Sequence, residues 1–122
     1  MFKKEIMEKI EFNSGQFIFK AGDDGGSMFL LASGVVGIFL PENVTDKPNF
    51  LVEDKEIFGE MGVIEDSLRS AHARCMENCV VIKVTKKEFN KKLDETDLFV
   101  KGLLRVLSTR LRETQKPKTL SN

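Results

Sequence analysis

The chain has 122 residues, which is enough for one domain with one hydrophobic core and too few for two. Hydrophobic residues at 41% and charged residues at 31% are ordinary for a globular protein. The 19 basic residues balance the 19 acidic ones, so overall charge gives no indication of nucleic acid or an anionic membrane as partner. No apolar run approaches the roughly 18 residues that a membrane-spanning helix needs, and the first residues lack the pattern of a secretory signal. We therefore expect a cytoplasmic protein without a membrane partner.

The first half of the chain alternates short apolar runs with turn residues. Residues 2–10 place apolar side chains at helical spacing, which predicts a short amphipathic N-terminal helix. Short β-prone runs come next at 16–20, 28–32 and 35–40, and another begins at Phe50. Turn signals separate these runs: residues 13–15, the Gly/Asp cluster 21–26, Ser33–Gly34 and the polar loop 41–49.

Residues 58–74, which read FGEMGVIEDSLRSAHAR, have the composition of a small anion site. Gly59 has no Cβ, so a ligand can approach the backbone closely there. A short helical turn starting near Glu60 would direct free N–H groups at an anion, and Arg69 adds a permanent charge whose planar fork suits phosphate oxygens. The Glu60 carboxylate would instead accept from a sugar hydroxyl, and phosphate with hydroxyl describes a nucleotide. A surface ion pair between Glu60 and Arg69 is the structural alternative.

The residues after this stretch predict two further strands. Residues 71–76 alternate, so small side chains share one face and leave room for a ligand. A turn is predicted at 77–78, with a strongly β-prone strand after it at 79–84. The small side chains on the shared face are Ala71, Ala73 and Cys75.

Two helices are predicted at the C-terminal end. Thr85 and Glu88 fit a capping box that starts a helix ending near residue 93. A longer helix over 97–113 carries an apolar stripe at i, i+4 spacing. The stripe consists of Phe99, Leu103, Leu107 and Leu111.

Many short strands with helices at the ends indicate a mainly β fold with flanking helices. We expect a double-stranded, jelly-roll-like β-roll with a short N-terminal helix and two C-terminal helices. In this prediction residues 1–122 form one domain, with the roll at about 10–85 and the helices at about 86–93 and 97–113.

Two sequence patterns resemble cyclic nucleotide-binding domains, which occur in the catabolite activator protein, the regulatory subunits of cyclic-AMP-dependent protein kinase and nucleotide-gated channels. F-G-E at 58–60 and R-S-A at 69–71 match the phosphate-binding cassette of that family. G-x-F-I-F-x-x-G-D-x-G with M-F-L-L-x-S-G-x-V after it is similar to its N-terminal half, so the resemblance covers about residues 6–112. The chain departs from the family at Gly26, Lys55 and Leu68, where an acidic or polar residue, Gly and Pro are usual.

The resemblance implies a regulatory domain that binds a 3′,5′-cyclic nucleotide, cyclic AMP rather than cyclic GMP, and needs no cofactor. No general base, nucleophile or metal set flanks the expected phosphate position, so we expect no catalytic or metal site and no enzyme activity. Aligning the last helix with the family brings Thr114 and Gln115 near the positions that contact the base; a solvated helix end is the alternative. The implied phosphate and ribose contacts are Phe58, Gly59, Glu60, Met61, Gly62, Arg69, Ser70 and Ala71.

The resemblance also implies a two-state mechanism. The ligand would draw the cassette inward, and the apolar residues 57–58 and 61–64 would repack against the C-terminal helices, which close over the base. It implies a homodimer seam along the second half of the last helix, with packing inside one chain as the alternative. The sequence offers no recognition helix or basic stripe, so we expect no specific DNA binding by this chain alone.

Three other interpretations remain open. The chain could be the sensor fragment of a helix-turn-helix regulator, or a degenerate interaction domain that kept the roll and lost the ligand. A hydrolytic enzyme such as a phosphodiesterase is disfavoured because metal ligands are lacking.

A haem or metal role for His72 is weighed against a structural one, which we favour. Cys75 and Cys79 are expected to be reduced, buried strand residues.

Overall fold

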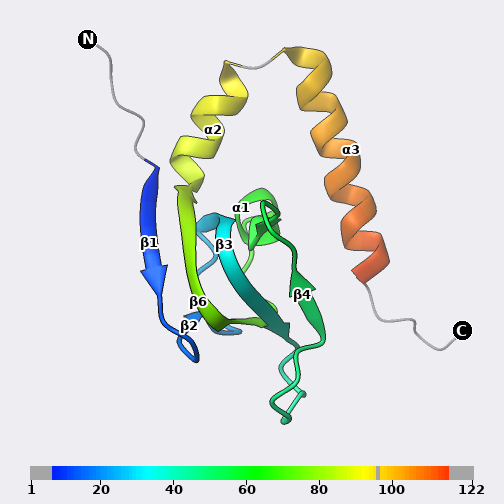
Figure 1. The fold of residues 1–122 in the computed structure, drawn as a ribbon. Coiled ribbons are helices and arrows are strands. Elements are labelled where there is room, and N and C mark those ends of the chain that lie inside the picture. Colours follow the sequence, from blue (N-terminus) through cyan, green and yellow to red (C-terminus); the bar gives the residue numbers. More distant parts are fainter. Residues whose placement is uncertain (1–6, 96, 116–122) are drawn as a thin grey trace, which may run out of the picture.

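The computed structural model describes residues 7–95 and 97–115, without the side chains of 108 and 111–115. The chain forms one six-stranded antiparallel sheet with one short helix beside it and two helices at its C-terminal end (Figure 1). The fold is therefore mainly β with flanking helices, as expected. The elements are β1 (Glu8–Phe12), β2 (Phe17–Phe19), β3 (Ser27–Phe39), β4 (Phe50–Val52), β5 (Ile57–Phe58), α1 (Glu60–Glu65), β6 (His72–Thr85), α2 (Lys86–Asp94) and α3 (Leu98–Gln115).

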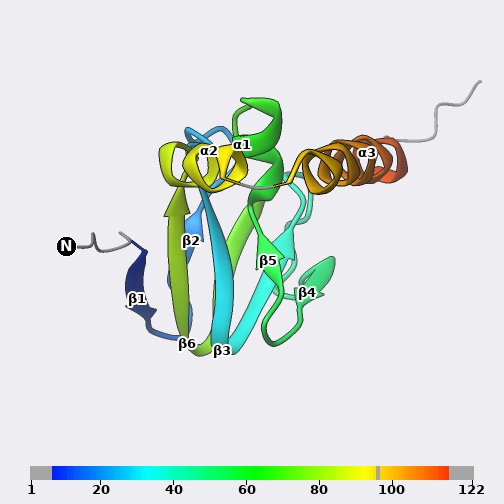
Figure 2. The same cartoon turned by 90° about the horizontal axis from the view of Figure 1, so that it is seen from above.

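Two long strands, β3 and β6, form the central pair of the roll. They pair antiparallel from Ser27 opposite Thr85 to Phe39 opposite His72. The other four strands flank this pair: β1 and β2 lie beside β6, and β4 and β5 lie beside β3. Figure 2 shows the long pair curving, with α1 and α2 at one end. This curvature brings the loop before β3 and the segment before β6 into one region, although they are far apart in sequence.

The expected N-terminal helix is wrong for the part that the structure describes. Residues 8–12 form β1, which pairs along its whole length with β6 from Lys83 to Cys79. Ile10 and Phe12, two residues apart, both pack against the core, which is the period of a strand. The helical spacing of the first apolar residues depended on Phe2 and Ile6, which lie outside the described residues. Pairing with the long edge of β6 therefore decides the conformation of residues 8–12.

The two turns predicted inside the long strands are also wrong. Ser33–Gly34 and Glu77–Asn78 do not end strands; they lie opposite each other within β3 and β6, where the pairing register shifts. Gly34 has a positive φ of 99°, and a Cβ on it would lie 2.4 Å from the Cβ of Cys79. Turn residues here accommodate a bulge rather than a reversal of the chain.

The core lies between the walls of the roll. Leu31, Val36, Val81 and Cys75 are completely or almost completely buried within it. Cys75 and Cys79 are both buried strand residues, as expected, and a hydrogen bond joins their Sγ atoms, which lie 3.0 Å apart. Ala73 also belongs to the core cluster, so the small residues of this strand face the interior of the roll.

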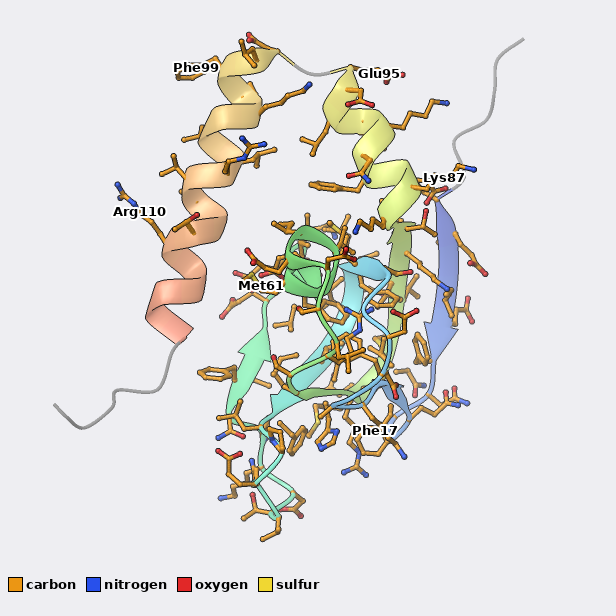
Figure 3. All side chains as sticks on the ribbon, turned by 180° about the vertical axis from the view of Figure 1, so that it is seen from behind. Phe17, Met61, Lys87, Glu95, Phe99 and Arg110 are labelled. Carbon is orange, nitrogen blue, oxygen red and sulfur yellow. The ribbon has the colours of Figure 1, made fainter. Side chains whose placement is uncertain are left out.

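The C-terminal helices extend from the end of β6. Thr85 and Glu88 form the predicted capping box: the Thr85 side chain accepts from the Glu88 N–H, and Glu88 accepts from the Thr85 N–H. After α2 the chain turns and α3 runs back along the side of the roll, contacting α1 (Figure 1). Figure 3 shows Phe99 and Arg110 projecting from the side of α3 away from α2. No helix within the described ranges is long and apolar enough to cross a bilayer.

Candidate phosphate-binding site

The site is built where β5 passes into α1. β5 pairs with β3 through Phe58 opposite Phe29, which fixes the chain just before the helix. Gly59 is the N-cap of α1 with a φ of 76°, a conformation that favours glycine. A Cβ on Gly59 would lie 2.9 Å from the Arg69 Nη1 and 3.1 Å from the Phe19 ring, so a side chain would displace the arginine.

Arg69 is the central side chain of this region. Although it is an arginine, only 8% of it is exposed. Its Nη1 donates to the Gly59 carbonyl oxygen at 2.9 Å, and its Nη2 donates to the Ser27 carbonyl oxygen at 2.7 Å. The buried Nε has no hydrogen-bond partner. The guanidinium thus joins the start of α1 to the start of β3 and leaves its buried Nε–H without a partner.

Aromatic rings hold the guanidinium in place. Its Cζ lies 4.1 Å from the centroid of the Phe19 ring and 5.7 Å from that of Phe29. Phe29 in turn stacks on Phe58, with ring centroids 5.4 Å apart. A planar cation over a ring face is favourable, and the effect increases when water is excluded.

The electrostatic balance at Arg69 leaves a buried cation. Burial lowers the pKa of Arg69 from its ordinary value, while the carboxylates of Asp23 and Asp24 act in the opposite direction. A guanidinium stays charged throughout the physiological range, so this burial makes the charge costly rather than removing it. Its hydrogen-bond acceptors are backbone carbonyls. An anion beside it would offset part of the cost of burying this charge.

The loop over residues 20–26 completes the surroundings of Arg69. Gly22 N–H donates to the Arg69 carbonyl oxygen at 2.8 Å, and Arg69 N–H donates to the Asp23 carbonyl oxygen at 2.8 Å. Gly25 packs directly against α1, where a Cβ on Gly62 would lie 2.8 Å from the Gly25 Cα. The loop therefore fixes both the main chain of Arg69 and the position of α1.

The structure brings Glu60 and Arg69 to the same region, as the sequence predicts. Glu60 is the first residue of α1 and half-buried, next to the Gly59 carbonyl that Arg69 holds. No ion pair joins Glu60 to Arg69, both of which lie in the described part of the chain. The surface ion pair considered as an alternative is therefore absent from this structure.

The other predicted phosphate and ribose contacts fall into two groups. Ser70 is exposed, Met61 is half-buried and Ala71 lies at the margin of the core beside Arg69. The Phe58 side chain belongs to the core, and Gly62 packs against the loop. Phe58 and Gly62 thus serve to position the cassette in this structure.

The predicted base contacts lie at the far end of α3. Thr114 and Gln115 are the last residues of the helix, and their side chains lie outside the described residues. Figure 1 shows this end of α3 directed away from α1. Their assignment to the base stays a prediction.

Sequence reasoning missed the groups that hold Arg69. The Ser27 carbonyl and the Phe19 ring belong to segments that the sequence indicates only as strands, and a backbone acceptor leaves no signal in residue type. The Gly/Asp cluster at 21–26 predicts a turn; its contact with Arg69 depends on the curvature of the sheet. Only that cluster, with its two carboxylates, could have indicated a role beside a cation.

A comparison with protein families identifies the family to which this chain belongs. A family model described as "Cyclic nucleotide-binding domain" matches residues 9–96. The chain belongs to the cyclic nucleotide-binding domain family. Its fold, with the cassette between β5 and β6, is the regulatory, ligand-binding module of that family, so the expectation drawn from the cassette motif is confirmed.

Relatives show the same module inside larger proteins. The chain is 30% identical over 115 residues to cGMP-dependent protein kinase 2 of Mus musculus, covering 92% of this chain and 15% of the kinase. It is 29% identical to the cyclic AMP receptor protein of Thermus thermophilus, covering 84% of this chain and 48% of the receptor. The chain thus spans less than half the length of either relative.

Solved structures agree with the fold. The cGMP-bound form of the EAL enzyme Bd1971 superposes with a TM-score of 0.75 at 33% identity, covering 88% of this chain and 29% of that one. The cAMP-bound form of the same enzyme superposes with a TM-score of 0.72. This cyclic nucleotide-binding domain therefore resembles part of an enzyme whose structure has been solved with either nucleotide bound.

Proposed function

We propose that this domain is a sensor whose Arg69 binds the cyclic phosphate of a 3′,5′-cyclic nucleotide. The observation that carries the proposal is the buried guanidinium, which has an unpaired Nε and is held by backbone carbonyls. A buried cation without a carboxylate partner gains more from an anionic ligand than one already neutralised. In this proposal Ser70 and the Ala71 N–H add to the phosphate contacts, Gly59 lets the ligand approach, and the Glu60 carboxylate accepts from the ribose hydroxyl.

We propose cyclic AMP as the preferred nucleotide. The Thermus thermophilus relative is named for cyclic AMP, and the kinase relative is named for cyclic GMP. The relatives thus support a cyclic purine nucleotide as the ligand class, and a direct comparison of the two nucleotides decides between them. Thr114 and Gln115 are proposed to contact the base after α3 moves.

Binding without turnover is the proposed chemistry. Arg69 and main-chain amides stabilise an anion in its ground state, and the proposal assigns no nucleophile or general base to the phosphate. The response is a two-state movement in which the cassette moves inward and α2 and α3 close over the base. Support for this movement comes from α3, whose apolar side chains Leu98 and Phe99 are 81% and 76% exposed in the structure described.

The longer context of the domain is a second proposal. Because the chain covers about half of the Thermus receptor, we propose the sensor part of a helix-turn-helix regulator as one context. A degenerate interaction domain is the competing function. A degenerate domain would fold but bind neither nucleotide, so a binding measurement distinguishes it from a nucleotide sensor.

Titration calorimetry with cyclic AMP and cyclic GMP tests the proposal, using the wild type, Arg69→Ala and the control Arg74→Ala. Arg74 lies on β6, and its Nε donates to the Gly15 carbonyl oxygen. We expect Arg69→Ala to lose roughly 2–5 kcal/mol of binding free energy, by analogy with breaking a buried charge pair. The Arg74→Ala variant should bind nearly as the wild type does. Equal binding by wild type and Arg69→Ala would remove Arg69 from the site.

A further inference from the structure

We propose that His72 is a positioning residue for the phosphate site, and that its neutral imidazole holds the loop over residues 20–26 against Arg69. The inference deepens the proposed function and rests on it. It would make nucleotide affinity depend on pH through a single side chain.

The first observation is a hydrogen bond to the ring. The Ala21 N–H donates to the Nδ1 of His72 at 3.0 Å. Nδ1 accepts only when it carries no proton, so this hydrogen bond requires the neutral imidazole with its proton on Nε2. The half-buried ring also meets the edge of Phe17, with centroids 6.0 Å apart and planes at 73°, which fixes its orientation.

The second observation concerns the two residues after Ala21 in the chain. Gly22 and Asp23 form the paired backbone hydrogen bonds with Arg69, each 2.8 Å long. His72 comes three residues after Arg69, so one short loop is joined to one short segment at three consecutive positions. Directly after this loop, at the first residue of β3, the Ser27 carbonyl oxygen accepts from the guanidinium. A displacement at Ala21 would therefore be transmitted to Arg69.

Protonation of His72 would break the hydrogen bond between Ala21 and His72. A proton on Nδ1 would face the Ala21 N–H, so two donors would meet where a donor and an acceptor meet now. Histidine is the side chain that changes charge between pH 5 and 8. The chain contains one histidine, so no second histidine contributes to a change in that range.

The charged groups nearest to this ring lie on the loop over residues 20–26 and on β6. Lys20 Nζ lies 4.8 Å and Arg74 Cζ lies 5.4 Å from the centroid of the same Phe17 ring that His72 meets. Asp23 accepts from the Lys20 N–H at 2.9 Å, and β3 places Phe39 opposite His72. Lys20 and Arg74 thus lie over the Phe17 ring that His72 meets, so a protonated His72 would add a positive charge beside that ring.

The affinity for cyclic AMP between about pH 8 and pH 5.5 tests the proposal with three proteins. The wild type should lose about five- to tenfold in affinity as pH falls, the equivalent of one hydrogen bond. His72→Asn places an amide oxygen where Nδ1 lies and does not titrate, so it should keep the affinity of the wild type at the higher pH and show a flat profile. His72→Phe has no acceptor and should bind weakly at both ends.

Coincident pH profiles for the wild type and His72→Asn would overturn the proposal, because any titration of the ligand or of carboxylates is shared by both proteins. The comparison does not depend on His72→Phe, which could fail to fold. Urea unfolding at each pH checks that the proteins compared are folded.

A nucleotide-free measurement separates this inference from the proposed function. In the wild type, the amide resonances of Ala21 and Gly22 should shift with the protonation of the imidazole, monitored on the same sample. If the wild type binds neither nucleotide at any pH, the proposed function fails while this titration still decides the role of His72. Amide resonances of Ala21 and Gly22 that do not respond to the imidazole would contradict it.

Discussion

Gly62 lies where the backbone of α1 meets the loop before β3. A Cβ there would lie 2.8 Å from both the Cα and the carbonyl oxygen of Gly25, and neither backbone atom can turn aside. We expect Gly62→Ala to lower the free energy of unfolding by roughly 1–3 kcal/mol, as overpacking does, and to weaken nucleotide binding. Equilibrium unfolding in urea measures the first effect.

Gly102 provides the matched control. It lies in α3, where a Cβ would meet nothing within 4 Å. Gly102→Ala should leave the stability unchanged or raise it by about 0.5–1 kcal/mol through helix propensity. Equal losses of unfolding free energy in Gly62→Ala and Gly102→Ala would contradict the predicted effect of the close contact between Gly62 and Gly25.

Cys79 gives a prediction in the alkaline range. Burial, a hydrogen bond with Cys75 and the Coulombic effect of Cys75 raise the pKa of Cys79 to about 12, from an ordinary 9.0. As pH rises, this thiol therefore ionises at a lower pH in the unfolded chain than in the folded one. Its contribution to stability is complete below about pH 9 and is lost as pH rises toward the pKa of about 12. Between about pH 8 and pH 10.5, the wild type should lose more free energy of unfolding than Cys79→Ala, whose residue 79 does not titrate. Parallel losses would contradict the pKa shift.

At the residue scale, the sequence predicts the chemistry of the site better than its surroundings. Gly59, Glu60 and Arg69 could be singled out because each residue type has one obvious role beside a nucleotide. The departure at Lys55 has a physical explanation in the structure: its φ is 69°, a conformation that usually favours glycine, and its Nζ donates to the Ala32 carbonyl oxygen at 2.9 Å. The backbone acceptors of Arg69 could not be predicted, since any residue at position 27 offers a carbonyl.

At the scale of elements, the junction of β6 and α2 carries the most direct prediction. Thr85 is both the last residue of β6 and the N-cap of α2. Thr85→Ala removes the acceptor for the Glu88 N–H and should cost about 0.5–2 kcal/mol of stability. Hydrogen exchange should show faster opening of α2. Thr109→Ala is the control, because the Thr109 hydroxyl donates within α3 to the Arg105 carbonyl oxygen and caps no helix.

The elements show what local pattern can and cannot decide. The capping box, α2 and α3 could be predicted because caps and 3.6-residue spacing are local signals. The long strands could not be predicted, because Ser33–Gly34 and Glu77–Asn78 have the composition of turns. These residues form a bulge only because the two pairs lie opposite each other in β3 and β6. The conformation of β1 depends on an unfilled edge of β6, which residues 8–12 do not encode by themselves.

At the scale of the whole molecule, α3 exposes a large apolar surface. Leu103 and Leu107 are 47% and 49% exposed on this helix. We propose that a second copy covers this face in a homodimer, and packing within one chain is the alternative. Leu103→Glu with Leu107→Glu should shift sedimentation from dimer to monomer, while Thr109→Glu adds charge elsewhere on α3 and should not. A wild type that sediments as a monomer at all concentrations would contradict the dimer.

The proposed phosphate site depends most on the unpaired donor of a buried arginine. NMR of the Arg69 Nε–H group during titration with cyclic AMP tests it directly, because this group has no hydrogen-bond partner in the structure. We expect the resonance to move downfield and saturate at one nucleotide per chain. Saturating nucleotide binding that leaves the Arg69 Nε–H resonance unchanged would contradict the proposed site.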